Sequence, residues 1–186
     1  MNFSARYQIL PLSQPQFSGW DAARLRKEFF QEVLVASADE DGCCTLAFKS
    51  QDLVLQDEVK LVFFQFEASL VACAILVDDE LRDGPDEEGF TGSYVFLADS
   101  IATFEPVDAA SLKGFFPDFE HFNQSAQYLD AKGIEGFVKF LAGRLVECDL
   151  EGFRPLETIA DILKDAEELY ETDPEVLALL EAETEP

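Results

Sequence analysis

Apolar residues are concentrated near the centre of the chain, in the stretch Glu58–Asp79, which reads EVKLVFFQFEASLVACAILVDD. Polar residues interrupt this stretch at Lys60, Gln65, Glu67 and Ser69, so it is not a membrane span. Two apolar runs on either side of a short polar turn predict a β-hairpin. Its strands are expected at Val59–Phe66 and Leu70–Val77.

Four shorter segments also have the composition of strands. They are Tyr7–Leu12, read as an edge strand or an extended arm, Glu32–Ala38, Cys43–Lys49, and Ser93–Glu105, read as one long strand or as two with a bend near Asp99-Ser100. The Asp-Gly pair in Asp39–Gly42 predicts a hairpin turn between the second and third of them. The acidic segment Asp78–Gly92 predicts a solvated, mobile loop. Such short connections favour antiparallel pairing in a barrel or rolled sheet.

Helices are expected on both sides of this β-rich part. Ser18 and Asp21 have the spacing of a capping box and predict a helix over Asp21–Phe30. Asp108 is the expected N-cap of a short helix within Val107–Gly114. Apolar residues at helical spacing predict three more helices, at Ile134–Val146, Pro155–Tyr170 and Glu175–Glu181. The last two have apolar faces that must dock on the barrel, on a second copy of the chain or on a partner.

Length and composition fit one domain with an appendage. A chain of 186 residues with 48% hydrophobic residues can bury a core, and its 18 Phe predict an aromatic interior. We divide the chain into a barrel domain at 1–146, with an N-terminal arm and helix, and an acidic helical extension at 147–186. The predicted fold class is α+β, a small mixed or antiparallel β-barrel flanked by helices.

The charge is strongly negative, with 13 basic and 38 acidic residues and a formal net charge of −25. This profile argues against a duplex-binding domain and against anionic membrane surfaces, because both need a basic face. It leaves open a soluble acidic protein, a protein that binds basic partners and a mimic of nucleic acid. The one basic region is N-terminal and contains Arg6, Arg24, Arg26 and Lys27.

Catalytic and metal-binding patterns are not found in the sequence. The four cysteines form no C-x-x-C pair, and we expect free thiols in a reducing cytoplasm. His121, the one histidine, has no nucleophile motif beside it, and the paired acids Asp78-Asp79 lack the spacing of a calcium loop. The N-terminus does not read as a secretory signal. We therefore predict a cytoplasmic protein that is not an enzyme and carries no cofactor or metal.

Three quoted stretches resemble a known superfamily over about Val33–Phe140. LQDEVKLVFF with SLVACAILVDD is similar to its hairpin, SYVFLADSIATFEPVDAASLKGFFPDF to its long barrel strand, short helix and aromatic turn, and HFNQSAQYLDAKGIEGFVKFL to its closing segment. The order of these features resembles the PUA-like superfamily, which includes EVE, ASCH and YTH domains. The first barrel strand, EVLVASADEDG, departs from the aromatic-rich opening of EVE domains, and the acidic charge departs from a nucleic-acid binder.

The resemblance implies a barrel that accepts a flipped or modified base into an aromatic-walled pocket. The implied wall residues are Trp20, Tyr94, Phe122 and Tyr128, and the implied edge-reading residues are Asn123, Gln124 and Asp130. Trp20 could instead pack its helix onto the barrel, the rings of Phe122 and Tyr128 could fill the core, and Asn123 and Gln124 could brace a loop. We expect Arg24, Arg26 and Lys27 near the mouth of this pocket.

Two functions therefore remain open. The first is a non-catalytic PUA-like module that binds a base of nucleic acid or a nucleotide. The second is an acidic module that binds a basic protein or mimics nucleic acid, with self-association into a homodimer through the C-terminal helices. An enzyme is a weaker third reading, because His121 and acid pairs are the only chemistry available to it.

Overall fold

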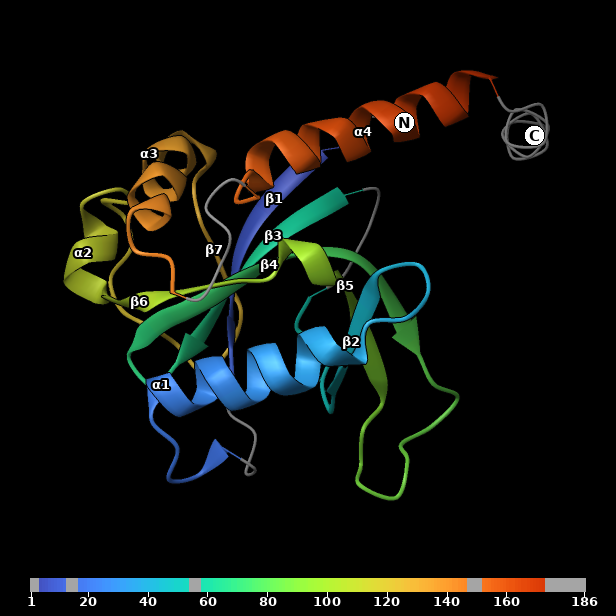
Figure 1. The fold of residues 1–186 in the computed structure, drawn as a ribbon, viewed down its shortest axis with the longest axis horizontal. Helices are drawn as coiled ribbons and strands as arrows, with labels where there is room; N and C mark the ends of the chain where they lie inside the picture. Colours follow the sequence, from blue (N-terminus) through green and yellow to red (C-terminus); the bar gives the residue numbers. More distant parts are fainter. Residues whose placement is uncertain (1–3, 13–16, 54–57, 147–151, 173–186) are drawn as a thin grey trace.

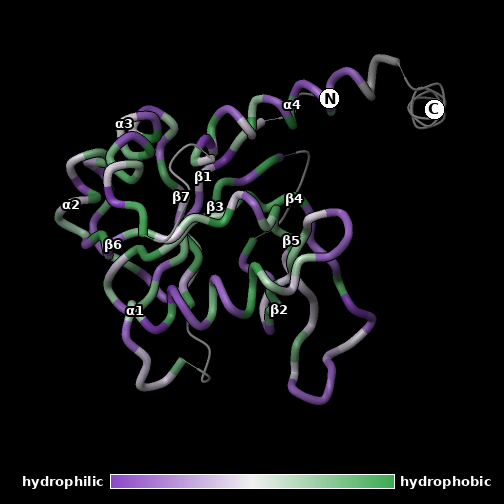
Figure 2. Tube along the Cα trace, viewed as in Figure 1, coloured by the Kyte–Doolittle hydropathy of each residue, from purple (hydrophilic) through white to green (hydrophobic). Residues whose placement is uncertain are grey.

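The protein folds around the predicted hairpin. A computed structural model describes residues 4–12, 17–53, 58–146 and 152–172. Strands β3 (Glu58–Phe66) and β4 (Ser69–Leu81) pair antiparallel at the centre of the fold, as predicted (Figure 1). They are the most apolar part of the trace, whereas the loop after β4 is hydrophilic (Figure 2). The hairpin turns at Glu67, which has a φ of 52° although it is not a glycine.

A mixed sheet extends from this hairpin on both sides. Its hydrogen-bonded order is β2-β5-β4-β3-β1-β7, and β6 pairs with the other end of β4. The remaining strands are β1 (Ser4–Pro11), β2 (Cys43–Phe48), β5 (Gly92–Leu97), β6 (Ala102–Asp108) and β7 (Gln127–Tyr128). The predicted bend at Asp99-Ser100 is confirmed as the turn η4 (Ala98–Ser100), which lets one segment pair along two parts of β4. β1 runs parallel to β3 and lies between β3 and β7, so it is not an edge strand.

Helices cover both faces of the sheet (Figure 1). On one face, α1 (Ala22–Arg24) continues into the π-helical stretch η2 (Leu25–Leu34) and the turn η3 (Val35–Ser37). On the other face lie α2 (Ala109–Lys113), α3 (Ala131–Ala142) and α4 (Pro155–Thr172). The predicted α+β class, with a mixed sheet flanked by helices, is confirmed.

The predicted aromatic interior is confirmed on both faces. Under η2, ring contacts run from Phe29 through Phe30 and Phe64 to Phe96, with centroids 5.1 to 5.4 Å apart. On the opposite face, Phe137 of α3 packs on Phe63 of β3 at 5.3 Å. Each pair buries a large apolar area and adds a favourable ring geometry.

The strand predicted at Glu32–Ala38 is wrong, because this segment completes the helix that begins at Asp21. The alternation of apolar residues that suggested a strand does not match the observed burial. Val33 and Val35 are 58% and 37% exposed, whereas Leu34 is 2% exposed. The pattern that decides the structure is the helical spacing of Leu25, Phe29, Phe30 and Leu34, which all pack on the sheet. The Asp39–Gly42 turn consequently joins a helix to β2 and is not a hairpin turn.

The acidic loop between β4 and β5 is shorter than predicted. β4 continues to Leu81, and β5 begins at Gly92. Asp86 organises the residues between them by accepting hydrogen bonds from Phe90 N at 2.9 Å and Glu88 N at 3.0 Å. The bond from Phe90 N is the main cause that lowers the pKa of Asp86 below its usual range. The loop is therefore a closed turn held by one carboxylate.

The helix predicted at Pro155–Tyr170 is confirmed as α4, and it packs on the same core as the barrel. Ile159 is 3% exposed, and Phe153, Leu156, Ile162 and Leu163 pack against the cluster that contains it. Part of the apolar face that was expected to dock thus docks on the sheet. The helix predicted at Glu175–Glu181 lies outside the described residues. No helix in the described part of the chain is both long and apolar enough to cross a bilayer.

Candidate functional site

One surface cavity is lined by two of the residues that the sequence nominated, Trp20 and Gln124. It has a volume of about 390 Å³ and lies at the carboxyl ends of the parallel strands β1 and β3. We call it the Trp20 cavity. Its lining residues are Pro11, Leu12, Phe17, Ser18, Gly19, Trp20, Gln65, Phe66, Glu67 and Gln124. Arg24 adjoins it through its contact with the Trp20 ring.

The turn that enters α1 positions Trp20. Gly19 has a φ of +78°, and Trp20 N donates to Phe17 O at 3.1 Å. Asp21 then caps the helix, because its carboxylate accepts from Arg24 N at 2.7 Å. The predicted helix start near Asp21 is confirmed, but the predicted capping box is wrong, because Asp21 is itself the N-cap and Ser18 lies in the preceding turn. The cap fixes Trp20 one residue before the helix and at the wall of the cavity.

The Trp20 ring makes two aromatic or cationic contacts. Phe17 meets it edge-on at 5.5 Å, and the guanidinium of Arg24 lies 4.3 Å from its centroid. Arg24 Nε also donates to Glu28 at 2.9 Å, so its charge is partly balanced. Trp20 thus packs against Phe17 and also lines the cavity, so both roles considered for it, helix packing and pocket wall, describe its position.

A second cavity lies on the other side of the segment that follows α2. It has a volume of about 610 Å³ and contains Asn123, Tyr128 and Asp130, together with His121 and Lys132. We call it the Tyr128 cavity. Its apolar wall consists of Phe115, Phe116 and Phe119. The neighbours Asn123 and Gln124 thus line different cavities.

Several polar groups of the Tyr128 cavity are occupied by structural bonds. The Gln127 side chain accepts from Asn123 N and donates to His121 O, both at 2.9 Å. Asp130 caps α3 by accepting from Lys132 N at 2.8 Å. Tyr128 is 64% exposed, and Arg6 lies 5.6 Å from its ring centroid. Several of the polar groups between Asn123 and Asp130 therefore stabilise the loop and the start of α3.

The structure places two nominated aromatic residues away from the Trp20 cavity. Tyr94 is 1% exposed, and its hydroxyl accepts hydrogen bonds from Asp52 N and Leu53 N at 2.8 and 2.9 Å. Burial raises its pKa, and the ring belongs to the core. Phe122 packs edge-on against Phe119 at 5.0 Å and supports the other core cluster. The pocket-wall role expected for Tyr94 is therefore wrong, because its ring is buried in the core.

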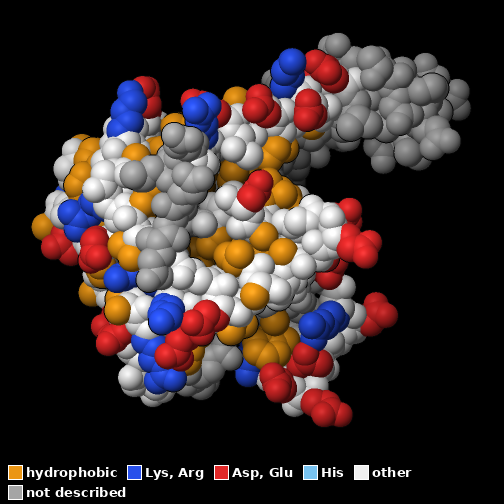
Figure 3. Space-filling model, in the orientation of Figure 1, with side chains coloured by type: hydrophobic (Ala, Val, Ile, Leu, Met, Phe, Trp, Pro, Cys, Tyr) orange, Lys and Arg blue, Asp and Glu red, His pale blue; other side chains and the backbone are white. Residues whose placement is uncertain are grey.

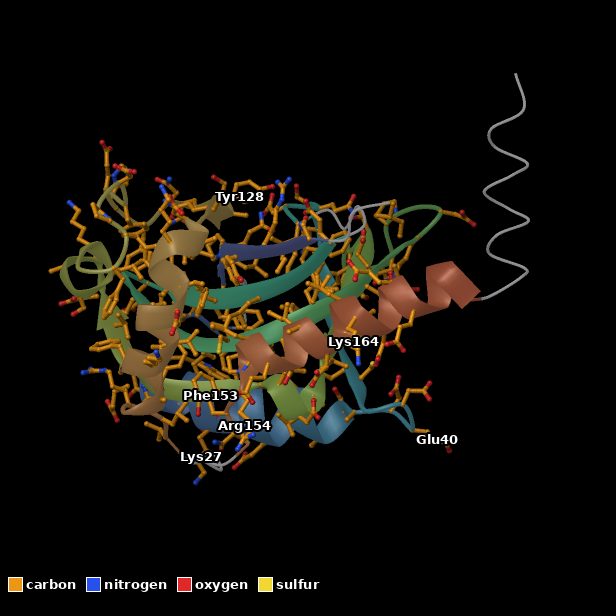
Figure 4. The ribbon with its side chains drawn as sticks, turned by 90° about the horizontal axis from the view of Figure 1, so that it is seen from above. Lys27, Glu40, Tyr128, Phe153, Arg154 and Lys164 are labelled. Carbon is orange, nitrogen blue, oxygen red and sulfur yellow. The ribbon has the colours of Figure 1, made fainter. Side chains whose placement is uncertain are left out.

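The three basic residues of the N-terminal helix are not equivalent. Arg24 stands beside Trp20, whereas Arg26 is buried and faces Glu105 at 3.9 Å. Lys27 is exposed and lies on the side of the molecule opposite Tyr128 (Figure 4). The cations near Tyr128 are instead Arg6 and Lys132, which were not nominated for this role.

A third cavity, of about 420 Å³, contains none of the nominated residues. It lies between η2, η4 and the start of α4, and its wall includes Gln31, Asp99, Phe153 and Arg154. Figure 4 shows Phe153 and Arg154 at the start of α4, on the side where Lys27 lies. No local pattern predicts this cavity, because three segments that are distant in the sequence form its wall.

The described thiols lack the features of an activated nucleophile. Burial raises the pKa of Cys44 to about 11, with smaller contributions from Cys43 and Asp39, and the pKa of Cys43 is raised as well. Thiolates are stabilised by nearby cations, and the charges that act on Cys43 are acidic. Among the described residues, no group of three or more His, Cys, Asp or Glu could hold a metal ion.

Alkylation tests this description of the thiols. In the native protein at pH 8, iodoacetamide should modify the partly exposed Cys43 before the buried Cys44 and Cys73, and the rate at Cys43 should still rise as the pH increases. Both pKa shifts are upward, so the thiolate fraction is below that of a free cysteine at this pH. Mass spectrometry of peptides gives the order. Equal labelling of Cys44 and Cys43 before unfolding would contradict it.

The fold was compared with known proteins. No family model and no curated protein matches the sequence. Among solved structures, an ASCH domain from Zymomonas mobilis matches with a TM-score of 0.39 and 13% identity, over 77% of this chain and 99% of that one. A YTH domain from Zygosaccharomyces rouxii, solved with N6-methyladenosine RNA, matches with a TM-score of 0.44 and 14% identity, over 74% and 86%.

The fold is similar to ASCH and YTH domains. These are two of the domain types that the sequence resemblance named for the PUA-like superfamily. At these TM-scores and identities the likeness concerns the course of the backbone and gives no position for a ligand.

Proposed function

We propose that the protein is a non-catalytic module that binds one base of a single-stranded nucleic acid, or of a nucleotide, in the Trp20 cavity. The observation that carries the proposal is that Trp20 and Gln124 line one cavity and that Arg24 lies against the Trp20 ring. An aromatic ring can stack on a base, an amide can pair with its edge, and a cation can meet its phosphate. The cavity volume lies within the range of about 300–1,000 Å³ that small-ligand sites occupy.

The charge of the chain shapes this proposal. A net charge of −25 repels a polyanion, and Arg24 already shares its charge with Glu28. Affinity must then come from stacking more than from counterion release, which sets the salt dependence of most nucleic-acid binding. We therefore expect short ligands to bind with a shallow salt dependence. A steep loss of affinity between 50 and 200 mM salt would point to a different, basic surface.

The single tryptophan makes the proposal directly testable. Trp20 is the only tryptophan in the chain, so intrinsic fluorescence reports on this cavity alone. Titration with short single-stranded oligonucleotides should quench this fluorescence as a base stacks on the ring. No quenching, and no heat in calorimetry at millimolar ligand, would overturn the proposal.

Replacement of Trp20 should weaken binding. Trp20→Ala removes the stacking surface, and the loss should be about 1–3 kcal/mol, which calorimetry measures without the fluorophore. Tyr128→Ala is the matched control, because it removes an exposed ring from the other cavity. Equal losses in both variants would place the ligand elsewhere. Thermal unfolding of each variant separates loss of affinity from loss of fold.

A second candidate function is favoured by the distribution of acidic side chains. They lie over the turn between η3 and β2, over the loop between β4 and β5, and along α4, and others lie among Lys and Arg side chains on the left of the view (Figure 3). Such a surface fits a basic protein, with fast and salt-sensitive association. Binding of a cationic peptide that salt abolishes, together with no oligonucleotide binding, would favour this function. Self-association through the C-terminal helices stays a prediction for sedimentation to test.

A further inference from the structure

One buried acceptor in the wall of the Trp20 cavity has no partner. Gln65 is the penultimate residue of β3 and is 3% exposed. Its side-chain Nε2 donates to Glu67 O at 3.0 Å, whereas its Oε1 makes no hydrogen bond. An amide oxygen left unpaired and out of water loses its hydration without compensation. A group that donates a hydrogen bond to this oxygen would restore the balance.

The orientation of this amide is fixed by its surroundings. Reversing it would place Oε1 against Glu67 O, so that two acceptors would face each other. The backbone of Gln65 is held as well, since its carbonyl accepts from Leu12 N at 2.8 Å. Glu67, which supplies the carbonyl, keeps a left-handed φ of 52° at the hairpin turn. A non-glycine residue in this region is uncommon and marks a backbone that the surrounding structure holds in place.

The wall around Gln65 suits the flat face and the edge of a base. Trp20, Phe17 and Phe66 supply apolar surface, while Gln124 and Gln65 supply amides. Of these groups, Gln65 Oε1 can only accept. Bases differ at their pairing edge in whether they present an amino donor or a carbonyl acceptor. The fixed acceptor therefore distinguishes between them.

We propose that Gln65 selects ligands that present an exocyclic amino group to its Oε1, so that a purine with a 6-amino group binds in preference to the same purine without it. This inference rests on the proposed base-binding function and adds its specificity. The amino group donates to Gln65 Oε1 while the ring stacks beside Trp20. A carbonyl at the same position would face Oε1 as a second acceptor and leave it unpaired.

The sharpest test compares two ligands that differ in this group alone. Adenosine monophosphate and purine riboside monophosphate have the same ring and phosphate, and only the first has the 6-amino group. Wild-type protein should bind the first about tenfold or more tightly, which corresponds to one unpaired buried acceptor. Trp20 fluorescence and calorimetry measure both affinities. The comparison needs no variant, so it stands even where a substitution harms folding.

Variants then locate the selectivity. Gln65→Met keeps the length of the side chain and removes the acceptor, so the ratio of the two affinities should fall to about 1, mainly through weaker binding of adenosine monophosphate. Gln124→Ala should keep the preference. Equal binding of both nucleotides to wild-type protein would overturn the inference and leave base binding intact. If neither nucleotide binds, the inference fails, and if short single-stranded oligonucleotides also leave Trp20 fluorescence unchanged, the proposed function fails with it.

Discussion

Replacing Glu58 with glutamine should destabilise the fold by about 3–5 kcal/mol, the usual result of removing one partner from a buried ion pair. The Lys60 side chain is 1% exposed, and its ammonium lies 2.7 Å from a Glu58 carboxylate oxygen. Arg6 of β1 reaches the same carboxylate at 2.5 Å. Glutamine keeps the shape of the side chain but leaves the buried ammonium beside a neutral amide.

Urea denaturation measures this effect, and the midpoint of thermal unfolding should fall by about 6–20 °C for a chain of this size. Lys60→Met is the matched control. It removes the buried charge, and Glu58 keeps Arg6 as its partner, so the loss should be at most about 1–2 kcal/mol. If the two variants lose equal stability, the burial of an uncompensated charge is not the cause. If Glu58→Gln is neutral, the pair does not contribute to folding.

The central hairpin could be predicted because its signal is local. Two apolar runs and a polar turn specify β3 and β4 without any knowledge of their neighbours. The same reasoning failed at residues 32–38, where two periodicities compete. Val33 and Val35 alternate as a strand would, but the burial of Phe30 and Leu34 on the sheet decides the conformation.

The candidate site divides in the same way. Trp20 could be nominated from the sequence because it is the single tryptophan of the chain and stands next to a helix cap. Gln65 was not visible, since its role depends on the conformation of Glu67 and on the approach of Gln124 from a distant segment. Tyr94 is an aromatic residue of the kind that can line a pocket, but its position on β5 buries it in the core. Residue type thus nominates candidates, and tertiary packing selects among them.

Gly133→Ala should destabilise the protein by about 2 kcal/mol, although alanine is the better helix former. Gly133 lies in the first turn of α3, where a Cβ would press into the carbonyl oxygen of Phe115 and reach 2.7 Å from the ring of Phe116. Both residues line the Tyr128 cavity, and neither the backbone nor the packed ring can move freely.

Gly136→Ala, one turn later on the same helix, is the control for this prediction. Its Cβ would meet the Phe115 ring at 3.5 Å, an ordinary contact, so helix propensity should prevail and stabilise the protein by about 0.5–1 kcal/mol. If the free energy of unfolding falls in one variant and rises in the other, the effect of steric contact is separated from that of helix propensity. Thermal and urea unfolding measure both, and a shared sign would mean that α3 does not approach Phe115 and Phe116 as closely as the structure places it.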